Sequence, residues 1–280
     1  MDRWLIRMAR LLGAAIGAFA GVVAVQLMRL RRMEFLPNHP GFWINHVVRP
    51  LGGTAEGRLL RLAVLGDSTT AGVGVDRPEH SLPYLLAQRL ADAERAAVHV
   101  VSYGWAGARI ADVLRLQLPR ALEPLRPTEQ EPFLPGADVV AIVAGANDAT
   151  HNTPPGRFRA DLREALHRIA SAAPRARVVV AGIPAFRGAL RGVEPLIFLA
   201  DQYARLLRPI GRAEAARAGL AYADLARGVP PLIRGRTDVL SRDRFHPSVV
   251  GYTAWADVIF DAIVSGVSAG RRGPVETAGA

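Results

Sequence analysis

Short apolar runs alternate with longer amphipathic stretches along the chain from residue 58 onward. Apolar runs with β-branched residues predict strands at about 61–66, 98–102, 138–144 and 177–183, and a weaker run predicts a fifth at about 220–225. Helical periodicity occupies the stretches between and after them, at about 80–96, 108–122, 157–172, 195–218 and 248–264. This alternation predicts an α/β domain in which a parallel sheet of five strands is covered by helices on both faces.

The N-terminal segment has a different pattern. Residues 11–28 are uncharged and apolar apart from Gln26, and arginines precede and follow them. Their length and flanks predict a hydrophobic helix that anchors the chain in a membrane without being cleaved. Two alternatives stay open: a cleaved signal peptide, because Ala18-Phe19-Ala20 fits a small-residue cleavage pattern, or a helix packed on the domain. Arginines on both flanks leave the orientation across the membrane open.

Four segments are therefore predicted. Residues 1–32 form the hydrophobic helix, 33–57 a linker rich in proline, glycine and aromatic residues, 58–268 the α/β domain, and 269–280 a disordered tail. The loop at 184–194 follows the fourth predicted strand. It is expected to line a ligand cleft, since ligands of open parallel sheets bind at the carboxyl ends of the strands.

Composition narrows the range of partners. The formal net charge is +10 and every basic residue is an arginine. These arginines are scattered through the chain without a basic stripe interleaved with aromatic residues, so we expect attraction to anionic lipid and no binding of nucleic acid. The chain has no cysteine, which excludes disulfides, thiolate metal sites and cysteine catalysis.

Candidate chemistry follows the predicted strands. Ser68 comes directly after the first strand, Gly104 after the second and Asn147 after the third. Asp243 and His246 lie three residues apart, just before the last predicted helix. A serine hydroxyl acts as a nucleophile when a histidine takes its proton and a carboxylate orients that histidine. Ser68, His246 and Asp243 are therefore the candidate nucleophile, base and orienting acid.

A carbonyl group attacked by the serine also needs hydrogen-bond donors for its oxygen. The backbone N–H groups of Ser68 and Gly104 and the side-chain amide of Asn147 are the candidates for this oxyanion hole. Asp67 is expected to satisfy backbone N–H groups at the turn, and Asp148 to support the loop of Asn147.

The motifs together resemble the SGNH hydrolases, also called the GDSL esterase/lipase family. Four blocks of this sequence carry the resemblance: Gly66-Asp67-Ser68-Thr69, Ser102-Tyr103-Gly104-Trp105-Ala106-Gly107, Gly145-Ala146-Asn147-Asp148 and Asp243-Arg244-Phe245-His246-Pro247. The resemblance covers about residues 61–264. It implies a flavodoxin-like three-layer α/β/α fold and ester hydrolysis through an acyl-serine, without a metal or organic cofactor.

The second block departs from the family pattern. The family often has asparagine two residues before its glycine, where this chain has Ser102. Gly107 therefore competes with Gly104 as the backbone donor. Trp105, beside Gly104, and His151, just beyond Asn147, are candidates for contact with substrate. The other histidines show no metal-ligand spacing.

These observations predict a membrane-associated serine esterase or lipase, with acyl lipids as the favoured substrates. An O-acetylesterase acting on carbohydrate or peptidoglycan is the alternative within enzymes, because it uses the same machinery. A non-catalytic binding protein with the same fold is the alternative outside them. The acyl donor, the oligomeric state and the side of the membrane are not determined by the sequence.

Overall fold

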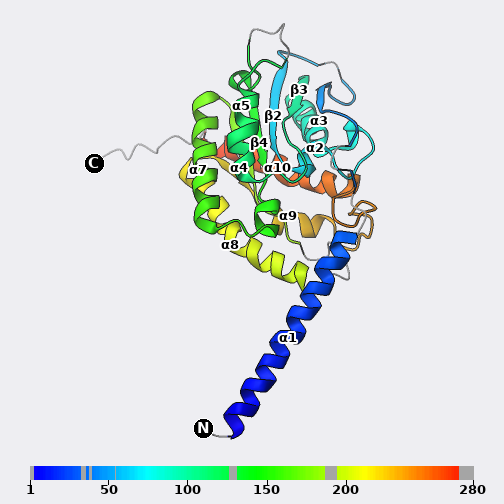
Figure 1. Cartoon of the computed structure of the whole chain (residues 1–280). Helices are drawn as coiled ribbons and strands as arrows, with labels where there is room; N and C mark the ends of the chain where they lie inside the picture. The colour runs from blue at the N-terminus through cyan, green and yellow to red at the C-terminus, as the bar shows by residue number, and fades with distance from the viewer. Residues whose placement is uncertain are drawn as a thin grey trace, which may run out of the picture.

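A computed structural model of the chain describes residues 3–32, 36–37, 40–53, 55–125, 131–186 and 194–270. A six-stranded sheet forms the centre of the domain, in the order β1-β3-β2-β4-β5-β6. Helices cover both of its faces, and the long α1 projects from one end (Figure 1). The three-layer α/β/α architecture is thus confirmed.

The five predicted strands all form, and they pair in parallel. They are β2 (Leu60–Gly66), β3 (Val98–Ser102), β4 (Val139–Val143), β5 (Arg177–Ala181) and β6 (Ala221–Ala223). Successive residues of β2 face opposite core layers. Leu62 and Val64 pack with one layer, and Ala63 and Leu65 with the other. Burial on both faces explains why these strands are almost continuously apolar.

The sheet has one strand more than the predicted five, because β1 (Asn45–Val48) pairs antiparallel with β3. This strand lies within the segment expected to be a linker. It is four residues long and carries two polar side chains, so no apolar run marks it in the sequence. It forms because the outer edge of β3 has unpaired backbone groups, and its flanking Ile44 is buried in the core.

The helices follow the predicted order with shifts of a few residues at their ends. The regular helices are α1 (Arg3–Arg32), α3 (Leu82–Glu94), α7 (Pro155–Ala172), α8 (Leu196–Arg217) and α10 (Val249–Gly270). The predicted helix at 108–122 is divided into α4 (Ile110–Asp112), the π-helical turn η2 (Val113–Gln117) and α5 (Leu118–Ala121). Short helices at strand ends are α2 (Ser68–Ala71) and α6 (Ala146–Thr150), and the 3₁₀ turns are η1 (Pro78–His80) and η3 (Leu134–Gly136).

Helix α9 (Leu225–Leu232) was not predicted. Its sequence ends in Pro230-Pro231, which usually indicates a loop. Asp224 nevertheless starts the helix by accepting a hydrogen bond from the N–H of Arg227 at 3.3 Å, and both prolines lie in its last turn. Helix α10 runs to Gly270, two residues into the predicted tail, and residues 271–280 of that tail lie outside the described part.

Among the described residues, two helices are long and apolar enough to cross a membrane. The first spans Arg3–Arg29, with a mean hydropathy of 2.1 and 6% of its most apolar window buried. The second spans Val249–Gly266 of α10, with a mean hydropathy of 1.2 and 39% buried. Tyr252, Ile259 and Ile263 of α10 belong to the core beneath the sheet, which accounts for its apolar composition.

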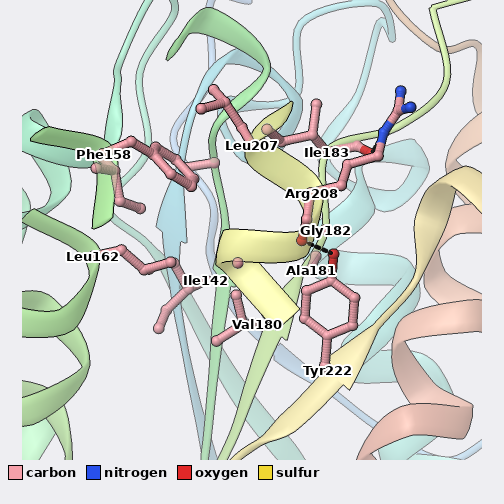
Figure 2. A pocket seen from close by; sticks show the side chains of 13 residues that line it. Ile142, Phe158, Leu162, Val180, Ala181, Gly182, Ile183, Leu207, Arg208 and Tyr222 are labelled. Carbon is pink, nitrogen blue, oxygen red and sulfur yellow. Dashed lines mark hydrogen bonds between the residues drawn. The ribbon is translucent and has the colours of Figure 1, made fainter. Parts of the chain in front are cut away.

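The opposite layer contains a small apolar cavity of about 10 Å³ beneath the ends of β4 and β5. Figure 2 shows Phe158, Leu162 and Leu207 around it and the hydroxyl of Tyr222 close to Gly182. A cavity of this size holds at most one water molecule, so it is a packing defect of the core and not a ligand site.

Gln117 fixes the end of β2 just before the nucleophile turn. The last pair of β2 with β3 joins Val64 to Ser102, so Gly66 extends beyond it. There, the fully buried Gln117 side chain forms the two hydrogen bonds that a neighbouring strand would otherwise form with Gly66. Its Oε1 accepts from the N–H of Gly66 at 2.8 Å, and its Nε2 donates to the carbonyl of Gly66 at 2.7 Å.

Gln117→Leu is expected to lower the free energy of unfolding by about 2–4 kcal/mol, because two buried backbone groups lose their partners. Urea denaturation followed by circular dichroism measures this change. The control is Gln88→Leu, which removes two hydrogen bonds at an exposed site and is expected to cost less than about 0.5 kcal/mol. Equal, small effects of the two substitutions would contradict a structural role for Gln117.

Candidate active site

Ser68 is the first residue of α2, immediately beyond the carboxyl end of β2. Asp67 caps this helix, since its Oδ1 accepts from the N–H of Thr69 at 3.0 Å and from the hydroxyl of Thr69 at 2.7 Å. The structural role expected of Asp67 is thus confirmed. Burial raises the pKa of Asp67 above its ordinary value, although both bonds from Thr69 act in the opposite direction.

The structure brings Ser68, His246 and Asp243 together. The Nε2 atom of His246 lies 3.0 Å from the Oγ of Ser68, and its Nδ1 lies 2.7 Å from the Oδ2 of Asp243. All three residues are buried. The arrangement can move the Ser68 proton to His246 and stabilise the charge that the imidazole then carries.

A tight loop at 239–248 holds the last two of these residues. The Oδ1 of Asp243 accepts from the Ser241 hydroxyl at 2.7 Å and from the N–H groups of Phe245 at 2.9 Å and His246 at 3.0 Å. Burial alone would disfavour the charged carboxylate. These bonds and the bond to His246 more than offset it and hold the pKa of Asp243 well below its ordinary value. Asp243 is therefore ionised at neutral pH.

Gly104 packs directly on the nucleophile turn. A Cβ atom there would lie 1.8 Å from the Oγ1 of Thr70 and 3.0 Å from the carbonyl oxygen of Asp67, so only glycine fits. Its N–H is directed at the Oγ of Ser102, 3.4 Å away. The same Ser102 hydroxyl donates to the carbonyl of Thr70 at 2.7 Å, so the residue that departs from the family pattern links β3 to α2.

Asn147 and Asp148 connect α6 to the loop that follows Gly104. The Nδ2 of Asn147 donates to the carbonyl of Ala108 at 3.0 Å, and the Oδ2 of Asp148 accepts from the N–H of Ile110 at 2.9 Å. Asp148 was expected to support the loop of Asn147; its carboxylate instead holds the start of α4, in the segment that follows Gly104. Its side chain is fully buried, and burial raises the pKa of Asp148, against the bond from Ile110.

Gly107 lies one residue before Ala108, in a turn closed by a bond from the Ala108 N–H to the carbonyl of Trp105 at 3.3 Å. Its φ is +83°, which favours glycine, and nothing lies within 4 Å of a Cβ placed there. Within the described residues, the N–H of Gly107 has no hydrogen-bond acceptor. This group is therefore available to a ligand.

The two remaining candidates lie apart from the largest cavity at the site. Trp105 is partly exposed and lines a small cavity of about 60 Å³ together with Gly104, Phe42 and Trp43. His151 is exposed, and its Nδ1 lies 2.9 Å from the carbonyl oxygen of Asn147.

A cavity of about 310 Å³ has Ser68, His246 and Asn147 in its wall. Most of its other lining side chains are apolar, among them Phe186, Val229, Ile233, Leu240 and Trp255. Residues 184–186 begin the loop expected to line a cleft, and they do line it, whereas residues 187–193 lie outside the described part. Helix α9 also lines the cavity, through Leu225, Val229 and Pro230. These lining residues were not predicted, because the helix was not predicted.

No group of three histidine or acidic side chains in the described ranges is placed to hold a metal ion. The polar groups of the candidate site include the Ser68 hydroxyl, the His246 imidazole and the amide of Asn147. These groups suit nucleophilic attack on a carbonyl and stabilisation of the resulting oxyanion.

In this three-layer α/β/α fold, a buried serine follows the carboxyl end of β2, and a buried histidine and aspartate from the loop before α10 lie beside it. This arrangement is typical of serine hydrolases. The profile of the GDSL-like Lipase/Acylhydrolase family matches residues 64–254, and the chain belongs to this family. The resemblance drawn from the four sequence blocks is confirmed.

Individual relatives agree with this assignment. The chain is 26% identical over 208 residues to the GDSL-like esterase Rv1075c of Mycobacterium tuberculosis, covering 73% of this chain and 62% of that protein. The alignment thus spans about three fifths of the length of this relative.

Two solved structures have the same fold. One is an extracellular lipase from Streptomyces rimosus, at 24% identity and a TM-score of 0.54, with 72% of this chain and 99% of that chain covered. The other is a lipase/acylhydrolase from Enterococcus faecalis, at 24% identity and a TM-score of 0.56, with 74% and 96% covered.

Asp148→Asn tests the hydrogen bond between the Asp148 carboxylate of α6 and the N–H of Ile110 in α4. The amide keeps an acceptor for the N–H of Ile110 but cannot ionise. The pKa of Asp148 is raised in the folded protein, so folding is favoured while this carboxyl is protonated. The wild type therefore loses stability as the pH rises from about 4, the pKa of Asp in the unfolded chain, through the raised pKa of the folded state. The free energy of unfolding of Asp148→Asn, minus that of the wild type, is expected to increase from pH 4.5 to pH 7.5 in urea titrations.

Asp201→Asn is the matched control. Burial of Asp201 would raise its pKa, but its bonds from Arg208 and from the N–H of Phe186 more than offset this and lower it. The advantage of the wild type over Asp201→Asn is therefore lost only below about pH 4 and is constant over the tested range. A pH-independent difference for Asp148→Asn as well would argue against the raised pKa.

Proposed function

We propose that this chain is a serine esterase that hydrolyses carboxylic esters, with acyl lipids as its substrates. One observation carries the proposal: the hydrogen-bonded series Ser68, His246 and Asp243 borders an apolar cavity of about 310 Å³. Cavities that bind small ligands have volumes of about 300–1,000 Å³ and mostly apolar walls. An acyl chain matches such a wall.

The proposed reaction uses only protein groups and water. The Oγ of Ser68 attacks the ester carbonyl carbon while Nε2 of His246 takes the hydroxyl proton. The tetrahedral intermediate collapses, the carbon–oxygen bond to the alcohol breaks, and His246 returns the proton to the leaving alcohol. Water then attacks the acyl-serine with His246 again as base, which releases the carboxylic acid and restores Ser68. The ionised Asp243 fixes the tautomer of His246 through Nδ1.

The oxyanion hole requires a choice between the two glycines. The N–H of Gly104 is directed at Ser102, and Gly104 itself packs against Thr70. The N–H of Gly107 has no acceptor in the described part of the chain, and Asn147 holds the neighbouring Ala108. We therefore assign the backbone donors to Ser68 and Gly107, with the free N–H of the Asn147 amide as the third.

This assignment is tested by a structure of the chain after reaction with an alkyl phosphonate. The phosphoryl oxygen is expected within about 3 Å of the backbone nitrogens of Ser68 and Gly107 and of Nδ2 of Asn147. A contact with the nitrogen of Gly104 and none with that of Gly107 would return the role to Gly104.

The activity itself is tested with p-nitrophenyl esters from acetyl to palmitoyl. Ser68→Ala is expected to lower kcat by about 10⁴-fold or more and Asp243→Asn by about 10³–10⁴-fold, with unfolding free energies measured in parallel. The wild type is expected to prefer medium or long chains, because the cavity wall is apolar. Ser171→Ala, at an exposed serine of α7, is the control and should retain full activity.

Other outcomes point to the alternatives. A sharp preference for acetyl esters would favour an O-acetylesterase acting on carbohydrate or peptidoglycan. Equal activity of Ser68→Ala and wild type would exclude Ser68 as the nucleophile. A wild type inert toward every ester and toward a fluorophosphonate would favour a binding protein.

We further propose that α1 is an uncleaved membrane anchor. Its span of 27 residues from Arg3 to Arg29 exceeds the roughly 20 needed to cross the hydrocarbon core, and it is largely exposed. The excess of arginine over the whole chain suits an anionic membrane surface.

A further inference from the structure

Exposed apolar side chains gather at the end of the domain from which α1 projects. Phe198 and Leu199 in the first turn of α8 are 42% and 41% exposed, and Leu232 at the end of α9 is 52% exposed. The neighbouring Pro230 and Pro231 are exposed as well. Figure 1 shows α9 and the start of α8 at this end. We call Phe198, Leu199 and residues 230–232 the α8–α9 surface.

Helix α1 is attached beside this surface. Gln26 is the one polar residue in the apolar stretch 11–28, and it is buried. Its Nε2 donates to the backbone carbonyl of Glu194, whose carboxylate accepts from the N–H of Phe198 at 3.1 Å. The apolar part of α1 therefore ends at the first turn of α8. A bilayer crossed by α1 lies directly against that turn.

The cavity at Ser68 reaches the same surface. Pro230 and Arg236 line the cavity and are also exposed, so the cavity opens along α9. On the side of α8, the cavity wall includes Phe186, whose N–H donates to Oδ1 of Asp201 in α8 at 3.1 Å. The cavity wall thus extends from α9 to a residue held by α8, and the exposed lining residues Pro230 and Arg236 lie on the side of α9.

Arginines accompany the apolar residues at this opening. Arg234 follows α9, is exposed, and has no acidic partner among the described residues. Arg236, which lines the cavity, is half exposed and paired with Asp238. Apolar tips next to arginines are typical of protein surfaces that bind the headgroup region of anionic membranes.

We propose that the α8–α9 surface lies in the headgroup region of an anionic phospholipid bilayer and that the cavity takes the acyl chain of a lipid ester directly from that bilayer. This inference deepens the proposed function and rests on it for the ester substrate. Because α1 fixes the domain at the membrane, shallow insertion of a few apolar side chains is sufficient to orient the opening toward the lipid.

The first test uses the full-length chain in vesicles of phosphatidylglycerol and phosphatidylcholine. The chain has no cysteine, so single cysteines carry an environment-sensitive NBD label without background. Leu199→Cys and Leu232→Cys probe the proposed surface. Their controls are Leu122→Cys and Leu116→Cys. Leu122 directly follows α5 and Leu116 lies on η2, away from α1, and their exposures match, at 40% and 54%.

In the vesicles, labels at 199 and 232 are expected to show blue-shifted emission at least about 2-fold brighter than that of labels at 122 and 116, which report water. Labels at 199 and 232 that also report water would overturn the proposal. So would a blue shift that grows with the protein-to-lipid ratio, because it would indicate contact between copies of the chain.

The second test measures the consequence for hydrolysis. Leu199→Glu/Leu232→Glu is expected to lower the rate on a long-chain ester in the vesicles by about 10-fold and to leave the rate on soluble p-nitrophenyl acetate unchanged. Leu116→Glu/Leu122→Glu should change neither rate. Equal losses in both pairs of variants, or no loss in either, would contradict delivery of substrate through this surface.

The two proposals fail in different ways. If the wild type hydrolyses no ester, the proposed function is wrong, yet the labels still report whether the surface contacts lipid. If esters are hydrolysed normally and the labels stay in water, only the docking surface is wrong.

Discussion

The site depends on the buried carboxylate of Asp243. A charge taken out of water is stable only when its lone pairs are satisfied, and here four hydrogen bonds do this within a single short loop. Three of them shape the loop and the fourth orients His246, so the group that fixes the backbone also sets the direction of the imidazole. That imidazole then meets Ser68, which is 178 residues away in the sequence.

A second set of contacts joins the loops on the opposite side of Ser68. Gln117 fixes the end of β2, Ser102 ties β3 to α2, and Asn147 holds the loop around Ala108. Each is a side chain bonded to the backbone of a different segment. The loops that follow three neighbouring parallel strands are thereby held in register with one another, which is what preorganised donors for an oxyanion require.

The end of the domain that carries α1 is connected to the candidate site through α8 and α9. Helix α1 ends on α8, α8 supports the wall residue Phe186 through Asp201, and α9 forms the other wall. Three hydrogen bonds thus connect α1, which supplies no group to the proposed chemistry, to the wall of the cavity beside Ser68: Gln26 with Glu194, Glu194 with Phe198, and Asp201 with Phe186. The strand β1, which follows α1 in the chain, completes the other edge of the sheet.

The sequence by itself determined the α/β alternation, the order of the five parallel strands along the chain and the residues Ser68, Asn147, Asp243 and His246. These features are local: apolar runs set the strands, and short motifs mark the turns after them. Only the tertiary structure shows the strand β1, the helix α9, the hydrogen bonds of Gln117 to β2, and the cavity. Their signals are absent or misleading in the sequence, since β1 is half polar, α9 ends in two prolines and Gln117 looks like any polar residue of a helix. The choice between Gly104 and Gly107 as the backbone donor also depends on the fold. Gly104 packs against Thr70, whereas Gly107 lies in a turn with open space around it. What packing and long-range pairing decide cannot be found in a local pattern.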